Sequence, residues 1–417
     1  MIRATLDPAT AFGRHPLQPH QLTDRITPTE HTIVLCHLGV PRINADDWSL
    51  TIDGLVRKSV HVALGELLRR PRVEITGIHQ CCGSPLKPDM PTRRVCNVVW
   101  GGTRLSELLA ECEPLPSARF LWSSGADYGV FEGITCEAFV KDLPLGRTAA
   151  DVLIAYEMNG APLRPENGYP VRLVVPGFYG TNSVKWLTRL TLAQARAAGP
   201  FTTRWYNDPA RDSSGQPTGA STPVWSIAPE SVIVSPAPNE TVGVGNVEVW
   251  GWAWPDGGVG AVDINADGVS NWIPASVEPS VGRAWQRFTA TVQVEARGSY
   301  EVCSRAQAPM DANSRNLARA TRFIVFQSLL YEFLCRRLAS VGHFAAHPHV
   351  RCKSQCLAWA KSGRRLRSSE RPRFATIDRD RCTRGVRRHA HPRHSCRFES
   401  ESMTSIPMHR LCSFVAG

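Results

Sequence analysis

The pattern of apolar and polar residues changes near the middle of this chain. Before about residue 210, runs typical of strands alternate with runs typical of helices. After residue 223 the apolar runs are short and β-rich, and Gly, Pro and Asn separate them. Residues 212–219 between the two parts have the composition of a turn or linker. The sequence therefore predicts an α+β fold class, with a mixed α/β domain followed by an all-β domain.

The first part contains several recognisable elements. We expect strands at 47–56, 73–78, 119–123, 152–157 and 171–175, and short helices at 64–69 and 105–112. The strand at 73–78 ends just before Cys81, so it delivers this cysteine to a loop. A loop mounted on a strand is a rigid support for a functional side chain.

The second part fits a sandwich of two sheets. We expect strands at 232–234, 247–254, 262–264, 288–294 and 300–304, which approach the ~7 strands in about 100 residues of an immunoglobulin-like sandwich. The alternating Trp250, Trp252 and Trp254 are expected to fill or flank its core. The predicted divisions are an N-terminal extension at 1–30, a first domain at 31–210, an immunoglobulin-like domain at 222–326 and a tail at 327–417.

The formal charge of +11 belongs to the tail. Residues 327–417 hold 18 Lys and Arg against 6 Asp and Glu, so the rest of the chain is close to neutral. Blocks of this composition are usually disordered, and we expect at most a helical turn or two at 329–335. The His and Cys residues of the tail lack the paired spacing of a structural zinc site. The 13 cysteines are odd in number and irregularly spaced, which argues against a disulfide framework.

Neither an export signal nor a membrane span is visible in the sequence. Residues 1–30 lack a continuous apolar stretch and paired arginines. None of the apolar runs reaches the ~20 residues that a membrane-spanning helix needs. We therefore expect a cytoplasmic location for this sequence, or a periplasmic one if its N-terminus is truncated.

Several motifs follow one another between residues 79 and 187. They are His79-Gln80-Cys81-Cys82-Gly83, Ala155-Tyr156-Glu157-Met158-Asn159-Gly160, Glu166-Asn167-Gly168-Tyr169-Pro170-Val171-Arg172 and Ser183-Val184-Lys185-Trp186-Leu187. In this order they resemble the sulfite oxidase family of molybdopterin-dependent oxidoreductases, and residues 164–170 look most like its bacterial sulfur dehydrogenase branch. The resemblance covers residues from about 30 to 325. It implies a sulfite-oxidase-type molybdopterin domain followed by a dimerisation domain.

The resemblance makes Cys81 the metal ligand and a catalytic residue. Molybdenum accepts soft thiolate ligands, and the cysteine sulfur would join those of the pterin. Cys82 stands where the family usually has a small residue. We favour Cys81 as the ligand, because adjacent side chains of an extended segment point to opposite sides.

The resemblance also implies a set of cofactor-binding residues: His37, Asp127, Asn167, Arg172, Ser183 and Lys185. Arginine offers a planar fork and lysine a point charge, which suits the pterin phosphate. Asn167 stands where many relatives have histidine, and an amide can replace imidazole as donor and acceptor. The alternatives are surface ion pairs for Arg172 and Lys185, a core histidine at His37 and a capping role for Asp127.

Tyr206 matches a tyrosine at the mouth of the family's site, where a phenol can donate to the substrate. Its alternative role is packing between the two domains. The match to sulfite itself is weaker, because Leu35 stands where the family has an arginine and 84–86 lack another. The candidates to replace these charges are Lys87, Arg93, Arg94 and Arg204. A weakly anionic or neutral sulfur or nitrogen oxide suits such a pocket better than a dianion.

The resemblance implies oxygen-atom transfer at a Cys-ligated molybdenum centre, with sulfite or a related sulfur compound as substrate. The sequence has no CxxCH haem motif, so we expect no haem and an external electron carrier such as cytochrome c. We also expect a homodimer. The alternative is a non-catalytic relative, an association module whose basic tail binds anions or nucleic acid. Binding to nucleic acid is disfavoured, because no aromatic platform accompanies the basic residues.

Overall fold

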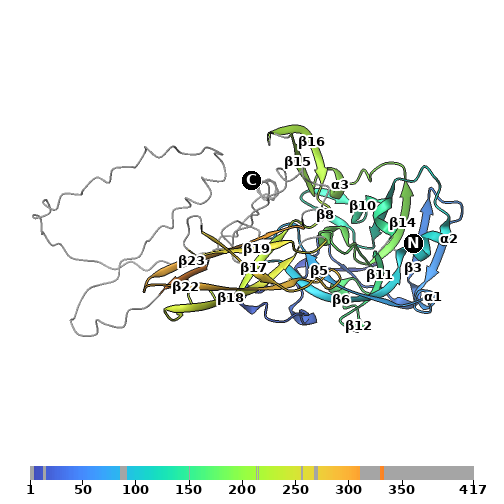
Figure 1. Cartoon of the computed structure of the whole chain (residues 1–417). Coiled ribbons are helices and arrows are strands. Elements are labelled where there is room, and N and C mark those ends of the chain that lie inside the picture. The colour runs from blue at the N-terminus through green and yellow to red at the C-terminus, as the bar shows by residue number, and fades with distance from the viewer. Residues whose placement is uncertain are drawn as a thin grey trace, which may run out of the picture.

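The computed structural model describes residues 4–12, 16–84, 92–149, 151–212, 214, 216–254, 257–266, 271–309 and 329–332. This part of the chain is mostly β, with three short α-helices among the described residues (Figure 1). They are α1 (Leu64–Leu67), α2 (Leu105–Cys112) and α3 (Pro200–Thr203). The helices predicted at 64–69 and 105–112 are confirmed. The first domain is nevertheless built chiefly from strands.

The first sheet of this domain has the order β10-β7-β14-β3-β4. Its strands are β3 (Ser49–Gly54), β4 (Val60–Ala63), β7 (Phe120–Gly125), β10 (Val140–Pro144) and β14 (Leu187–Ala193). Strands β14 and β3 are parallel, whereas the other neighbours are antiparallel. Leu50, Ile52 and Leu190 of this sheet pack with Leu105 and Leu108 of α2 in the main core.

The second sheet carries the strand that leads to Cys81. It consists of β5 (Val73–Gln80), β6 (Val95–Arg104), β11 (Leu153–Met158), β12 (Ala161–Pro162) and β13 (Arg172–Val174). Its order is β12-β11-β6-β5, and β13 also pairs with β11. The strand expected at 73–78 thus continues to Gln80, and Cys81 follows it directly as expected.

Short irregular elements connect these sheets to the cavity described below. They include the pairs β1 (Leu6–Asp7) with β2 (Val40–Pro41), β8 (Gly129–Phe131) with β9 (Ile134–Cys136), and β15 (Asn207–Arg211) with β16 (Pro217–Pro223). The 3-10 helices are η1 (Ala9–Phe12), η2 (Pro19–Gln21), η3 (Thr29–His31), η4 (Ala45–Asp47), η5 (Leu145–Ala149), η6 (Pro165–Asn167) and η7 (Gly180–Asn182). Of these, η6 and η7 carry residues that line the cavity.

The second domain contains two four-stranded sheets. One has the order β17-β18-β22-β21 and the other β20-β19-β23-β24. Their strands are β17 (Glu230–Ser235), β18 (Gly245–Trp254), β19 (Ala261–Asn265), β20 (Trp272–Pro274), β21 (Ser276–Val277), β22 (Gln286–Val294), β23 (Ser299–Gln307) and β24 (Leu329–Glu332). Val249 and Phe288 of the first sheet share a core with Ile264 and Val302 of the second. The predicted strands of this domain are all present.

Trp252 and Trp254 of β18 are buried and Trp250 is partly buried, and they flank the core between the two sheets instead of filling it. Trp252 and Trp254 pack with Leu22, Ile78 and Val95, which belong to the N-terminal segment and the second sheet of the first domain. They therefore bury the boundary between the domains rather than the core between the two sheets. In Figure 1, β17 and β18 lie beside β5 and β6 at this boundary.

The helical turn expected at 329–335 is wrong for the residues that the structure describes there. Residues 329–332 form β24, which pairs with the edge of β23 because that edge offers unpaired backbone groups. The rest of the tail predicted at 327–417 lies outside the described residues. Among the described helices, each is too short or too polar to cross a membrane.

Candidate cofactor and active site

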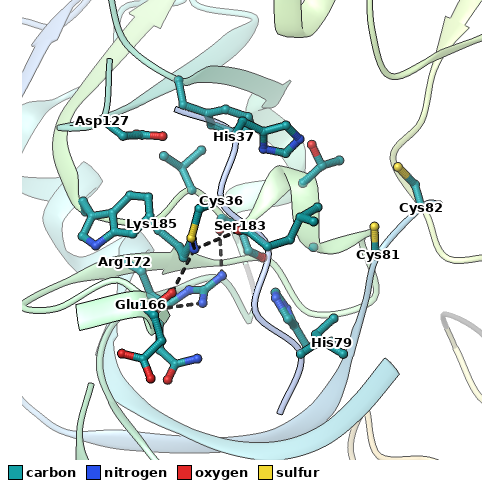
Figure 2. Close-up of a pocket in the computed structure, with 18 of the residues that line it drawn as sticks. Cys36, His37, His79, Cys81, Cys82, Asp127, Glu166, Arg172, Ser183 and Lys185 are labelled. Atoms are coloured by element: carbon teal, nitrogen blue, oxygen red, sulfur yellow. Dashed lines mark hydrogen bonds between the residues drawn. The ribbon is translucent and has the colours of Figure 1, made fainter. Parts of the chain in front are cut away.

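A cavity that is partly open to solvent lies in the first domain. Its lining includes all of the predicted site residues: His37, Cys81, Asp127, Asn167, Arg172, Ser183, Lys185 and Tyr206. They come from the segment before β2, the residue after β5, the β7–β8 connection, η6, the start of β13, the η7–β14 connection and the residue before β15. Figure 2 shows Cys81 and Cys82 on one side of the cavity and Arg172 and Lys185 on the other.

The basic side of the cavity is held by backbone carbonyls. The Lys185 ammonium donates to the carbonyls of Leu35 and Glu166, each at 2.9 Å, and to Cys36 Sγ at 3.1 Å. The Arg172 guanidinium donates to the carbonyls of Asn167 and Ser183, each at 2.9 Å. Burial lowers the pKa of both side chains, that of Arg172 to about 10, so the arginine stays charged at neutral pH. These contacts exclude the surface ion pairs considered as alternatives.

Gly168 lets these two cations lie against η6. Its φ is +109°, in the left-handed region that favours glycine. A Cβ at this position would lie 3.1 Å from the Cβ atoms of both Arg172 and Lys185. Ser183 completes the support, because its hydroxyl accepts from the Val175 amide at 3.0 Å.

Tyr206 and His37 meet at another part of the lining. The Tyr206 hydroxyl and His37 Nε2 are 2.5 Å apart, and the direction of this hydrogen bond depends on the histidine tautomer. Phe139 stacks on the imidazole with ring centroids 5.4 Å apart. Burial, helped by the charge of Lys185, lowers the pKa of His37 to about 4, so the ring is neutral at pH 7. Tyr206 has a φ of +62°, so its backbone is held in an uncommon conformation.

Asp127 is 4% exposed and follows β7. Burial raises the pKa of its carboxyl to about 7, against the opposing charge of Lys185. Gly125 makes room for this side chain, because a Cβ there would lie 2.4 Å from Asp127 Oδ1. The Asp127 carboxyl lies in the cavity wall near Lys185, so this geometry does not support the alternative of a capping role.

The two adjacent cysteines both line the cavity, so the expectation that they point to opposite sides is wrong. Strict alternation holds inside a strand, but β5 ends at Gln80 and the backbone bends at Cys82. Hydrogen bonding from the Cys82 side chain lowers the pKa of the Cys81 thiol to about 6, and Gly83 and Arg94 act in the same direction against burial. Cys81 therefore has the thiolate character that a metal ligand needs.

The lining fits a polar cofactor such as a pterin. Asn167 Oδ1 and Thr181 Oγ1 are buried and have no hydrogen-bond partner within the protein, although both residues line the cavity. Buried polar atoms are nearly always satisfied, so these two are suited to partners on a bound ligand. With the cations on one side and a thiol on the other, the residues match a phosphate-bearing group that also carries a thiophilic metal.

Sequence reasoning gave no site role to three further lining residues, Cys36, His79 and Thr181. A usable signal existed for His79, because it stands on β5 two residues before Cys81, whereas Thr181 lies in the 3-10 helix η7 and has no such signal. Alternate residues of extended backbone share a face. Cys36 has no such signal, since it directly precedes His37.

The family resemblance implied arginines at residue 35 and within 84–86, and among the described residues other cations replace them only in part. Leu35 lines the cavity and is 40% exposed, so it presents an apolar surface there. Arg93 is engaged by Glu230 away from the cavity lining, and Arg204 lies over the Trp205 ring. Arg94 approaches the Cys81 thiol, whereas Lys87 lies outside the described residues.

Comparisons with known proteins agree with this geometry. A family model described as the oxidoreductase molybdopterin binding domain matches residues 37–201. The chain is 30% identical over 308 residues to a sulfite oxidase of Gallus gallus. The matched residues cover 67% of this chain and 66% of that protein. It is 31% identical over 306 residues to the mitochondrial sulfite oxidase of Homo sapiens, covering 67% of this chain and 55% of that protein.

A solved structure is also similar. The sulfane dehydrogenase SoxCD from Paracoccus pantotrophus matches with a TM-score of 0.63 and 26% sequence identity, over 79% of this chain and 88% of that chain. Fold and cavity define a molybdopterin-dependent oxidoreductase. Within that class, the chain belongs to the sulfite oxidase family. The chain spans 66% of the length of the Gallus gallus enzyme and 55% of that of the Homo sapiens enzyme.

Proposed function

We propose that this protein transfers an oxygen atom at a molybdenum centre ligated by Cys81, with sulfite or a related sulfur compound as substrate. An external electron carrier such as cytochrome c would complete the reaction. The observation that supports this proposal is the shared cavity, which has a thiol of lowered pKa on one side and a buried arginine with a partly buried lysine on the other.

The cofactor would be held by residues of this chain with distinct tasks. Arg172 and Lys185 would bind the phosphate, and the unsatisfied Asn167 Oδ1 would accept from the pterin. Cys81 would ligate the metal. When bound, the molybdenum cofactor supplies the two-electron oxygen-atom transfer, while the protein supplies position and charge.

Tyr206 and the neutral His37 would orient the substrate. A phenol hydrogen-bonded to a neutral imidazole offers a fixed hydroxyl without adding a charge. The neighbouring Lys141 is fully buried, and its ammonium lies 5.1 Å from the Tyr206 ring centroid. This cation–π contact and the donation from Lys141 to the Phe201 carbonyl at 2.9 Å hold the tyrosine in place.

The substrate would carry less charge than the sulfite dianion, or the site would bind sulfite weakly. Leu35 contributes no charge to the cavity, and Glu230 neutralises Arg93. Among the described residues, Arg94 and Lys141 are cations whose charges act on the two cysteines. A sulfur compound with one charge or none would need fewer fixed cations. The likeness to a sulfane dehydrogenase supports this reading of the site.

Metal analysis tests the proposal. The full chain, produced in a host that makes the cofactor, should contain about one molybdenum per chain, as expected for a single ligating thiolate. Cys81→Ser should lose the metal, whereas Cys112→Ser should retain it, because Cys112 is buried in α2 away from the cavity lining. Wild-type protein should also oxidise sulfite with ferricyanide or cytochrome c as acceptor. Equal molybdenum in wild type and Cys81→Ser would refute the assigned ligand.

The second domain is proposed to be an immunoglobulin-like sandwich that forms a homodimer. Its two four-stranded sheets share one core, which supports the sandwich. Light scattering of the purified full chain should give twice the monomer mass of 46.0 kDa. A monomer at micromolar concentration would contradict the dimer and leave the molybdenum proposal standing.

A further inference from the structure

One carboxylate of the second domain holds both ends of the connection that carries Cys81. Glu230, at the start of β17, accepts through Oε2 from the side-chain amide of Gln80, the last residue of β5. Its Oε1 accepts from Arg93 Nε at 2.7 Å, just before the chain enters β6. All three residues are buried, with exposed fractions of at most 5%.

The Gln80 amide is fixed from its other end as well. Its Oε1 accepts from the indole of Trp254 at 2.8 Å, so its nitrogen must face Glu230. Next to it, the Cys81 amide donates to the Arg94 carbonyl at 2.9 Å. The Arg94 amide in turn donates to the Ser84 hydroxyl at 2.7 Å. The turn formed by residues 81–84 is therefore tied to a network that begins in the second domain.

We infer that Glu230 is a positioning residue: through Gln80 and Arg93 it makes the second domain set the place of the Cys81 thiol. The inference rests on the proposed role of Cys81 as the metal ligand. A ligand must be held within about 0.5 Å of its productive position, which requires support from surrounding side chains. A buried carboxylate paired with a guanidinium and an amide gives such support, because each partner would be desolvated without it.

Two substitutions separate positioning from general stability. Glu230→Gln keeps the shape of the side chain but loses one acceptor and the charge that faces Arg93. Gln80→Leu leaves the Glu230–Arg93 ion pair in place and removes the link to the turn. The control is Asp263→Asn, which breaks the Asp263–Arg305 ion pair between β19 and β23 inside the same domain.

The first measurement is the alkylation rate of Cys81 in cofactor-free full-length protein, followed with iodoacetamide and peptide mapping. Glu230→Gln and Gln80→Leu should alkylate Cys81 about tenfold faster, the change expected when one buried hydrogen bond is lost. Asp263→Asn should keep the wild-type rate at Cys81. The second measurement is molybdenum content, which should fall in the first two variants and not in the control.

Each outcome decides the inference. If Glu230→Gln fails to fold, Gln80→Leu decides, because its ion pair is intact. Wild-type alkylation and wild-type molybdenum in a folded Gln80→Leu protein would overturn the positioning role. If the wild type itself binds no molybdenum, the proposed function fails, while the alkylation rates still test whether Glu230 places Cys81.

Discussion

Burial sets the ionisation of the acid and the imidazole in the cavity. It favours the neutral form of each, raising the pKa of Asp127 to about 7 and lowering that of His37 to about 4. Arg172 and Lys185 also have lowered pKa values, but they are bound to carbonyl oxygens that favour their charged forms. The cavity is therefore positive on the side assigned to the phosphate.

Asp127 should make the stability of the cofactor-free protein depend on pH. Its carboxyl has a pKa near 3.8 when exposed and about 7 when folded, so between these values the folded state holds a proton that the unfolded chain has released. The free energy of unfolding should fall as pH rises from about 4 to about 7, by up to roughly 4 kcal/mol, and then level off. Urea denaturation at several pH values checks this slope. Asp127→Asn should flatten it, and an unchanged slope in that variant would contradict the assignment.

Leu35→Arg should strengthen the binding of sulfite. Leu35 lines the cavity and is 40% exposed, so an arginine has room there and would add a charge-assisted hydrogen bond to an anion. We expect the KM for sulfite to fall by about tenfold or more, since such bonds contribute about 1.5–3 kcal/mol. Leu68→Arg, on the exposed surface after α1, is the control and should leave the KM unchanged. A KM for sulfite that does not fall in Leu35→Arg would mean that the anion does not bind near this residue.

At the scale of elements, alternation predicted some strands, and a valine-rich run at 171–175 predicted the wholly buried β13. The expected strands at 47–56 and 119–123 correspond to β3 and β7, whose inward and outward residues alternate. It missed β6, because eight of its ten residues are buried and alternation is lost. Gly102 also weakens the strand signal of β6, because glycine is uncommon inside strands. A Cβ there would lie 2.3 Å from the Ile154 carbonyl oxygen, so glycine is needed for close pairing with β11.

The candidate site was predicted largely through ordered motifs. Spacing alone could not bring His37, Cys81 and Tyr206 together, because they are separated by long stretches of chain. The error about Cys82 arose where a strand ends, since alternation is a property of extended backbone. The support from Glu230 could not be predicted, because nothing local to β17 indicates which side chain of the other domain it meets.

Gly168 offers a test of how η6 places the cations. Gly168→Ala introduces strain at φ +109° and pushes a Cβ to 3.1 Å from Arg172 and Lys185. Gly160→Ala is a matched control, because Gly160 also has a positive φ but has open space where an added Cβ would lie. Both variants should lose about 1–2 kcal/mol of stability from backbone strain. Gly168→Ala should in addition lose most of its bound molybdenum, as measured by metal analysis. If both variants keep the same amount of molybdenum, Gly168 has no role in cofactor binding.

At the scale of the whole molecule, the N-terminal segment joins the two domains. The carbonyl of Leu22 accepts from the Trp252 indole at 2.6 Å, and that of Arg25 accepts from the Trp285 indole at 2.9 Å. The Arg25 carbonyl also accepts from Asn97 in β6 at 2.7 Å. A segment expected to be an extension thus lies, for residues 22–25, between the first and second domains. Indole donors that bind carbonyls of this segment hold the apolar boundary in register.

Leu22 therefore tests whether the two domains unfold together. Leu22→Ala should lower the free energy of unfolding by about 2–4 kcal/mol, because it leaves a cavity among Ile78, Trp252 and Trp285. Leu68→Ala, at a side chain that is 50% exposed, should stay within about 0.5 kcal/mol of wild type.

Two buried thiols report the domains separately in denaturant, Cys112 for the first and Cys303 for the second. If the boundary couples the domains, both thiols should become reactive at the same denaturant concentration, and Leu22→Ala should lower that concentration for both. Exposure of Cys303 at a concentration where Cys112 stays protected would show that the domains unfold independently, so that Leu22 stabilises only one of them.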